Sequence, residues 1–399
     1  MGFIFRVPAA PTFIPTGYFG GGLATDVTSE IDGIQFDTES AINPTATLSV
    51  ARHLLAGVNS SSRGYFGGGS STAGATPVVA EIDGIQFSDE SSINPTATLT
   101  IPRTFLAAVN SSTRGYFGGG YVGVNPGFNE IDGIQFDTEA AINPAATISL
   151  ARYGLTGVNS STRGYFGGGY INGAVFEIDG IQFDTETAIN PSAVLAIARY
   201  YTAGVNSTTR GYFGGGNTGP VVSEIDGIQF DTEAAINPAS TLSGARYVHT
   251  GASSYTRGYY VGGYNTTYSA EIDGIQFDTE AAINPAATIS LARYGLTGVN
   301  SSTRGYFGGG YITGAVFEID GIQFDTETAI NPTATLAIAR EYAAGVNSTT
   351  RGYFAGGDTY TTHVNEIDGI RFDTEAAINP AATMTVTRTG AAGVQSGSL

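Results

Sequence analysis

Short apolar segments recur along this chain and are separated by polar turns or glycines. In one stretch of the sequence they occupy residues 55–59, 63–66, 81–87 and 96–101. None of these segments carries a sustained apolar period of 3.6 residues, so helices are not expected. The pattern instead predicts four β-strands in this stretch.

The third segment contains Asp83-Gly84, a pair that also suits a two-residue hairpin turn. The runs on either side are too short to form two further strands. We therefore favour a single bulged strand at this position, with the hairpin turn as the alternative.

The four-segment pattern occurs eight times. Each copy contains Gly-Tyr-Phe-Gly-Gly-Gly or a close variant, then Glu-Ile-Asp-Gly-Ile, then Ile-Asn-Pro and an Arg. The copies of the glycine motif start at Gly17, Gly64, Gly115, Gly164, Gly211, Gly258, Gly305 and Gly352, which are 47 to 51 residues apart. A repeat of about 40–50 residues with four strands is typical of a propeller blade.

The two ends of the chain complement each other. The first unit begins at its second strand, and residues 391–396 supply a surplus first strand after the last unit. Pairing of the two would close a ring and remove the exposed sheet edges. We therefore predict an all-β fold, a single eight-bladed β-propeller over residues 17–399, closed by the C-terminal strand in the N-terminal blade.

The unit resembles the kelch repeat over nearly all of residues 17–399. In kelch blades a double glycine ends the second strand, an aromatic-Asp pair ends the third, and an Arg follows the fourth. Here these features are Gly67-Gly68-Gly69, Phe36-Asp37 and Arg52. The Trp that is usual after the third strand is absent, and Ile42 is expected in its place. Nearly identical, Gly-rich, Cys-free repeats also resemble, loosely, the fibre and attachment proteins of tailed phages.

Composition excludes several classes of function. The formal net charge of −18 disfavours binding to nucleic acid. No apolar run is long enough to span a bilayer, so no membrane insertion is expected. The N-terminus lacks the features of a secretory signal. We expect a protein of a virion or extracellular particle that has no classical signal peptide, or otherwise a cytoplasmic one.

The repeated chemistry favours structure over catalysis. Asp37 and Glu39 have equivalents throughout, and we interpret them as turn caps and partners of the Arg in each Arg-Gly-Tyr motif. Carboxylates also suit Ca²⁺, so binding of Ca²⁺ is kept as an alternative. No other cofactor is expected. The periodic Arg residues, of the Arg52 and Arg63 types, are expected to join blade to blade. The recurring Asn-Ser-Ser and Asn-Ser-Thr triplets are interpreted as polar turns.

An enzyme is not expected. The chain has no Cys, its three His residues show no ligand-like spacing, and no nucleophile motif is present. One active site would also need only one set of acids, whereas these acids recur in every unit.

Variation between units concentrates in two places: the loop after the second strand, where all length differences fall, and the two residues after the Arg. In a four-stranded blade both open on the same face. Loops on a rigid scaffold commonly carry binding, and Tyr offers a flat apolar surface with a hydroxyl. The candidate ligand-binding residues on this variable face are His53, Phe105, Tyr121, Tyr153, Tyr170, Tyr200, Tyr201, Tyr247, His249, Tyr264, Tyr268, Tyr294, Tyr311, Tyr342, Tyr360 and His363. The alternative is relaxed constraint on exposed loops.

Residues 1–16 lie outside the repeat and are predicted to form an extended docking arm. Prolines in this segment forbid a helix. Its apolar side chains should dock on something, and we favour a neighbouring subunit and hence a homo-oligomer. The assembly residues are Phe3, Ile4, Phe5, Val7, Phe13 and Ile14.

Three functions follow as hypotheses. The first is a virion fibre or surface adhesion protein that recognises a glycan or protein receptor through the Tyr-rich face. The second is a structural protein that decorates a capsid or builds a filament through its arm. The third, which the sequence supports least, is a carbohydrate-active enzyme.

Overall fold

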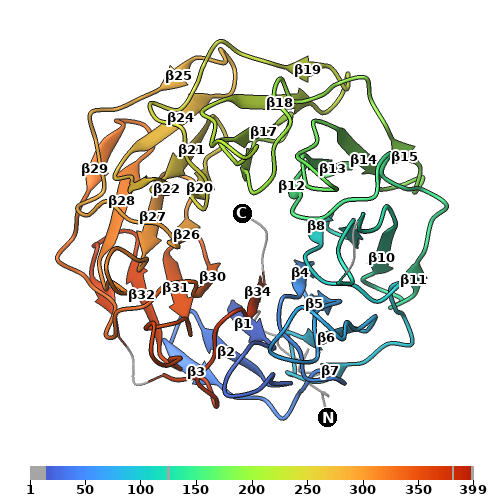
Figure 1. Ribbon diagram of the computed structural model, residues 1–399. Coiled ribbons are helices and arrows are strands. Elements are labelled where there is room, and N and C mark those ends of the chain that lie inside the picture. The colour runs from blue at the N-terminus through green and yellow to red at the C-terminus, as the bar shows by residue number, and fades with distance from the viewer. Residues whose placement is uncertain (1–14, 124–125, 380–381, 397–399) are drawn as a thin grey trace, which may run out of the picture.

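The computed structural model describes residues 15–123, 126–379 and 382–396. They form eight four-stranded antiparallel sheets arranged as the blades of a wheel (Figure 1). The predicted all-β, eight-bladed propeller is therefore confirmed. Within these residues no helix is present that could cross a membrane.

Each blade runs outward from the central axis as four strands, in sequence order except in the blade at the closure, where β34 is innermost. The innermost strands are β4 (Ala56–Asn59), β8 (Ala107–Asn110), β12 (Thr156–Asn159), β16 (Ala203–Asn206), β20 (Thr250–Ser253), β26 (Thr297–Asn300), β30 (Ala344–Asn347) and β34 (Ala392–Gln395). The second strands are β1 (Thr16–Gly20), β5 (Arg63–Gly67), β9 (Arg114–Gly118), β13 (Arg163–Gly167), β17 (Arg210–Gly214), β21 (Arg257–Val261), β27 (Arg304–Gly308) and β31 (Arg351–Ala355).

The third strands all begin at the first Ile of the Glu-Ile-Asp-Gly-Ile motif: β2 (Ile31–Gln35), β6 (Ile82–Gln86), β10 (Ile131–Gln135), β14 (Ile178–Gln182), β18 (Ile225–Gln229), β24 (Ile272–Gln276), β28 (Ile319–Gln323) and β32 (Ile367–Arg371). The outermost strands are short: β3 (Ser40–Ile42), β7 (Ser92–Ile93), β11 (Ala141–Ile142), β15 (Ala188–Ile189), β19 (Ala235–Ile236), β25 (Ala282–Ile283), β29 (Thr328–Ile330) and β33 (Ala377–Ile378). One loop adds a small hairpin of β22 (Tyr264–Asn265) and β23 (Thr267–Tyr268).

The ring closes between the two ends of the chain, as predicted. Strand β34 pairs antiparallel with β1, with Tyr18 opposite Val394. The backbone N–H of Thr16 donates to the Ser396 hydroxyl at 2.7 Å. Strand β1 thus begins one residue before the predicted boundary of the arm. The predicted assembly residues lie outside the described residues.

Two details of the strand prediction are wrong. The outermost strand lies before the Asn-Pro pair, at Ser92–Ile93, whereas residues 96–101 contribute one β-bridge between Glu81 and Thr98. Proline has no N–H to donate, so the hydrogen-bonded ladder of the outermost strand ends before the proline. The third strand has no bulge, because its register with β5 is continuous. Its glycine is needed instead because a Cβ on Gly84 would stand 2.4 Å from the Gly64 carbonyl oxygen.

Aromatic stacking joins each blade to the next. The Tyr of every second strand stacks on the Phe that follows the third strand of the next blade, with ring centroids 5.3–5.5 Å apart. The Tyr353–Phe36 pair makes this contact across the closure of the ring. The next aromatic position, such as Phe66, covers a glycine of the preceding blade, where a Cβ on Gly20 would meet the ring at 2.7 Å.

A buried ion pair also spans each junction, as predicted for the Arg52-type residues. The Arg52 carbonyl accepts from Gly22 of the preceding blade, while its guanidinium lies 2.7 Å from the Asp83 carboxylate of the following blade. The same guanidinium donates to the Phe66 carbonyl. Seven equivalent pairs surround the ring, and Arg388 with Asp32, at 2.6 Å, is the one at the closure.

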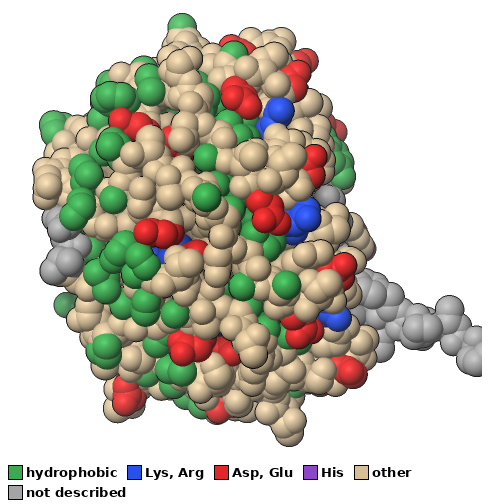
Figure 2. Space-filling model, turned by 90° about the vertical axis from the view of Figure 1, so that its right-hand side faces the viewer, with side chains coloured by type: hydrophobic (Ala, Val, Ile, Leu, Met, Phe, Trp, Pro, Cys, Tyr) green, Lys and Arg blue, Asp and Glu red, His purple; other side chains and the backbone are tan. Residues whose placement is uncertain are grey.

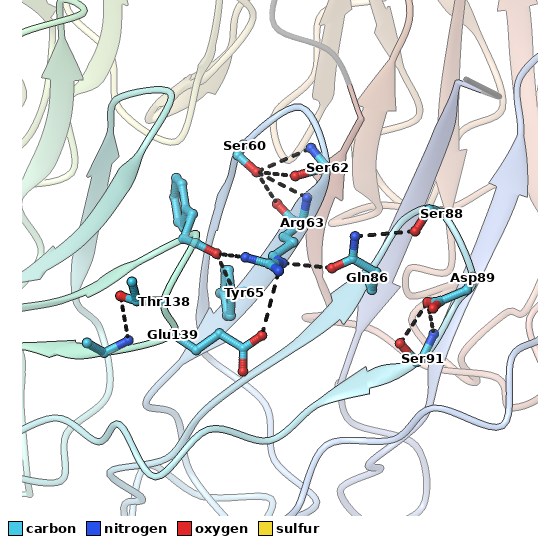
Figure 3. Close-up of polar contacts among 12 residues, drawn as sticks. Ser60, Ser62, Arg63, Tyr65, Gln86, Ser88, Asp89, Ser91, Thr138 and Glu139 are labelled. Atoms are coloured by element: carbon cyan, nitrogen blue, oxygen red, sulfur yellow. Dashed lines mark hydrogen bonds and ion pairs between the residues drawn. The ribbon is translucent and has the colours of Figure 1, made fainter. Parts of the chain in front are cut away.

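The Arg of the Arg-Gly-Tyr motif forms a second, more exposed junction (Figure 3). Arg63 donates to Gln86 at 2.7 Å in its own blade and to the Phe136 carbonyl in the next. The Glu139 carboxylate lies 4.0 Å away. At the closure, Glu39 accepts from Arg351 at 3.2 Å. The predicted pairing of the repeated acids with these Arg residues is therefore confirmed at several junctions.

The recurring Asn residues have a role that the sequence did not predict. They lie at the ends of the innermost strands and form a ladder along part of the ring around the axis. The side chains of Asn110, Asn159 and Asn206 each donate to the corresponding Asn carbonyl of the preceding blade at 3.0 Å. Only the Ser after each Asn caps the turn, as Ser60 does by accepting from the N–H of Arg63.

Candidate functional site

The two variable regions lie together on one face of the wheel. In blade after blade, the residue after the Arg forms an antiparallel bridge with the first residue of the loop after the second strand. Tyr153 with Tyr170 and Tyr294 with Tyr311 are examples. Because bridge partners point their side chains the same way, each bridge sets two variable side chains side by side.

These bridges place aromatic rings in a continuous row that we call the first arc. Its successive ring centroids are 4.8–6.5 Å apart. Such spacings are typical of interacting aromatic pairs. The first arc consists of Phe105, Tyr121, Tyr153, Tyr170, Tyr200 and Tyr201.

A second arc follows further around the same face, beyond Asn217, which occupies a position held by Tyr in the blades on either side. Its ring centroids are 5.5–6.4 Å apart. The second arc consists of Tyr247, Tyr264, Tyr268, Tyr294, Tyr311, Tyr342 and Tyr360.

Solvent reaches both arcs. All their members are at least partly exposed, and Tyr201, Tyr342 and Tyr360 are 45%, 47% and 74% exposed. Edge-on, Figure 2 shows hydrophobic side chains, a class that includes Tyr, gathered toward one face, with Arg beside Asp or Glu toward the other. Desolvation raises the pKa of Tyr153 and Tyr294, so both hydroxyls stay protonated and can donate hydrogen bonds.

The three candidate histidines do not join the arcs. His53 is buried and bridges to Ser70. His249 packs its ring on Tyr260 at 5.8 Å, and its Nε2 lies 3.0 Å from the Gly214 carbonyl oxygen, in the junction between blades. Desolvation lowers the pKa of His249 to about 3. His363 lies beside the second arc, with its Nδ1 3.6 Å from the Asp358 carboxylate.

Two acidic residues next to the second arc were not among the predicted site residues. Glu341 and Asp358 are bridge partners at the positions that Tyr294 and Tyr311 occupy one blade earlier. Glu341 is 8% exposed, and desolvation, followed by the charge of Asp358, raises its pKa to about 7. Aligning the eight residues that follow the Arg would have revealed it, because Glu341 is the single acid among them.

The opposite face carries a different feature, a cavity of about 550 Å³ at the mouth of the central channel. Its lining is uncharged and comes from the turns between first and second strands, including Asn110, Ser111, Asn159 and Ser160. Tyr255, 63% exposed, stands among these turns. Among the residues that the structure describes, no group of three or more acids and histidines is placed to hold a metal ion.

Comparison with known proteins supports the fold and gives no information about function. No protein-family model matches the sequence, and a search of curated proteins finds no match. Among solved structures, the chain is similar to YjhT, also a propeller, with a TM-score of 0.51 and 11% sequence identity. The match covers 70% of this chain and 97% of that one.

Proposed function

We propose that this protein is a kelch-like, non-enzymatic binding propeller that recognises a glycan through its two aromatic arcs. The single observation that carries the proposal is the row of partly exposed rings at 4.8–6.5 Å, repeated twice on one face. A glycan fits this arrangement because a sugar has apolar C–H patches that rest on rings and hydroxyls that bond to Tyr.

The length of the arcs supports an extended ligand. Each arc crosses from blade to blade, so consecutive units of an oligosaccharide can contact consecutive rings. Tyr rings lose little conformational entropy on binding, and their hydroxyls provide direction. The rings are held by backbone bridges such as Tyr153–Tyr170, so the site is formed before the ligand arrives.

The surroundings support a surface role. The variable face carries every length difference between units, whereas the junctions and the opposite turns are nearly invariant. We therefore place the protein on a virion fibre or another particle surface, where such a face reaches a receptor. A structural subunit that decorates a capsid or builds a filament is the alternative.

A glycan array tests the proposal. Wild-type protein should retain a defined set of oligosaccharides, and Tyr153→Ala combined with Tyr294→Ala should reduce their binding by about tenfold or more. Tyr255→Ala is the matched control, because it removes an exposed Tyr from the opposite face. Absence of any hits for folded protein, or an equal loss in the control, would argue for the structural alternative.

A further inference from the structure

The aromatic face contains two copies of one local arrangement, 141 residues apart, within segments that are nearly identical in sequence. In each copy the ring of an exposed Tyr lies over a glycine, and its N–H donates to that glycine's carbonyl. The distances are 3.3 Å for Tyr201 to Gly154 and 3.1 Å for Tyr342 to Gly295. We call the two arrangements cradles: the first consists of Tyr153, Gly154, Tyr170, Tyr200 and Tyr201, and the second of Tyr294, Gly295, Tyr311, Glu341 and Tyr342.

The cradles differ at one lining residue and at its bridge partner. The first has Tyr200 bridged to Asn217, and the second has Glu341 bridged to Asp358. The backbones match, with N–O distances of 2.9–3.0 Å in both bridges. The same scaffold therefore presents a neutral ring in one copy and a carboxyl group in the other.

One oxygen of the Glu341 carboxyl group is buried without a hydrogen-bond donor in the described part of the chain. Its Oε2 is buried and has no hydrogen bond among the described residues. That atom lies 3.1 Å from the position that a Cβ on Gly295 would occupy, which places the carboxyl group in the second cradle. An unpartnered buried polar atom costs stability, and a donor that reaches it removes this cost.

The groups that face Glu341 are acidic or neutral. They are Asp358 from the loop after β31 and the hydroxyls of Tyr294, Tyr311 and Tyr342. The nearby His363 pairs with Asp358 and not with Glu341. No Arg or His among the described residues forms an ion pair with Glu341. None of the described residues therefore supplies a donor to this oxygen, and a cationic donor would satisfy both its hydrogen bond and its charge.

We propose that the second cradle binds the ammonium group of an amino sugar, with Glu341 as its counter-ion and the surrounding Tyr rings as its walls, while the first cradle binds neutral sugar. This inference rests on the proposed glycan recognition and names the chemistry of one site within it. Tyr rings attract cations through their electron-rich faces, and a nearby carboxylate adds to the attraction. The net charge of −18 favours approach of a cation as well.

Isothermal titration at pH 7 tests this with two probes that differ in one group, a glucosamine tetrasaccharide with free amines and its fully N-acetylated counterpart. The wild type should bind the amine form about tenfold more tightly, and Glu341→Gln should abolish that preference. Asp184→Asn is the control, because it removes the same charge from an exposed turn at the other end of the strands and should leave the preference unchanged.

The two cradles supply reciprocal variants whose fold the chain itself supports. Glu341→Tyr combined with Asp358→Asn copies the first cradle and should lose the amine preference, whereas Tyr200→Glu combined with Asn217→Asp copies the second and should add a second amine-selective site. A wild type without amine preference, or a preference that survives Glu341→Gln, overturns the inference. Retained binding of neutral glycans would then leave the proposed function standing, and loss of all glycan hits would remove both.

Discussion

Buried Arg–Asp ion pairs join neighbouring blades, and the loss of unfolding free energy on breaking one pair can be predicted. Arg152 and Asp179 lie 2.7 Å apart with side chains 0% and 3% exposed. Burial lowers the pKa of Arg152, and Asp179 acts against that shift. Asp179→Ala leaves a buried cation unpaired and should cost about 3–5 kcal/mol of unfolding free energy in urea denaturation. Asp137→Ala, which removes an exposed acid, should change it by less than about 0.5 kcal/mol.

His249 should make stability sensitive to acid. Its pKa in the folded protein is about 3, below the ordinary 6.5, so the unfolded chain takes up a proton that the folded protein refuses. Stability is therefore lost as pH falls from 6.5 toward 3. His249→Leu, which copies Leu155 and Leu296 at the same position of other blades, should shrink the drop in melting temperature between pH 7 and pH 4. An unchanged drop would contradict this assignment.

Glu341 should act in the opposite direction. Its pKa is raised from 4.5 to about 7, so the folded protein retains a proton that the unfolded chain releases. The stabilisation that this retained proton provides is present at pH 4.5 and is lost as pH rises to 7. Differential scanning calorimetry should show wild-type stability falling relative to Glu341→Gln over this interval. A constant difference between the two proteins would count against burial of an unpaired carboxyl group.

Within a blade, the stability cost of replacing a glycine depends on whether the added Cβ would meet backbone or a side chain. A Cβ on Gly133 would stand 2.4 Å from the backbone oxygen of Gly115, which cannot move without breaking the ladder. A Cβ on Gly118 would meet the Phe166 ring at 2.7 Å, and Ala355 occupies this position in another blade. Gly133→Ala should therefore cost roughly 1–3 kcal/mol, and Gly118→Ala clearly less. Equal costs in urea denaturation would contradict this distinction.

The strands show where sequence patterns suffice. The second and third strands were predicted closely because their sequence motifs recur almost unchanged in all eight units. The outermost strand was misplaced because Ser92–Ile93 is too short to stand out from the longer apolar run that follows it. The Asn ladder was missed because a side chain's partner in the neighbouring blade leaves no local pattern. The variable face was recognised from its variation, but the inward turn of His249 and the buried carboxyl group of Glu341 depend on packing.

The closed ring depends on a strand from the very end of the chain. Removal of residues 391–399 deletes β34, leaves one edge of β1 unpaired and exposes the buried Tyr18. The lost pairing and burial should lower the melting temperature by roughly 5–10 °C. Deletion of residues 72–75 is the control, because it shortens the loop at 70–80 to the seven residues found in other blades and should have little effect. An unchanged melting temperature after the C-terminal truncation would contradict closure by this strand.

The whole molecule presents an aromatic face and an uncharged channel mouth on opposite sides, so the position of a bound ligand decides between them. The most direct measurement is a crystal structure with the oligosaccharide that binds best on the array. We predict sugar rings stacked along Tyr121, Tyr153 and Tyr170 or along Tyr264, Tyr294 and Tyr311. An oligosaccharide seated instead among the Asn-Ser turns around Tyr255 would contradict recognition by the aromatic arcs.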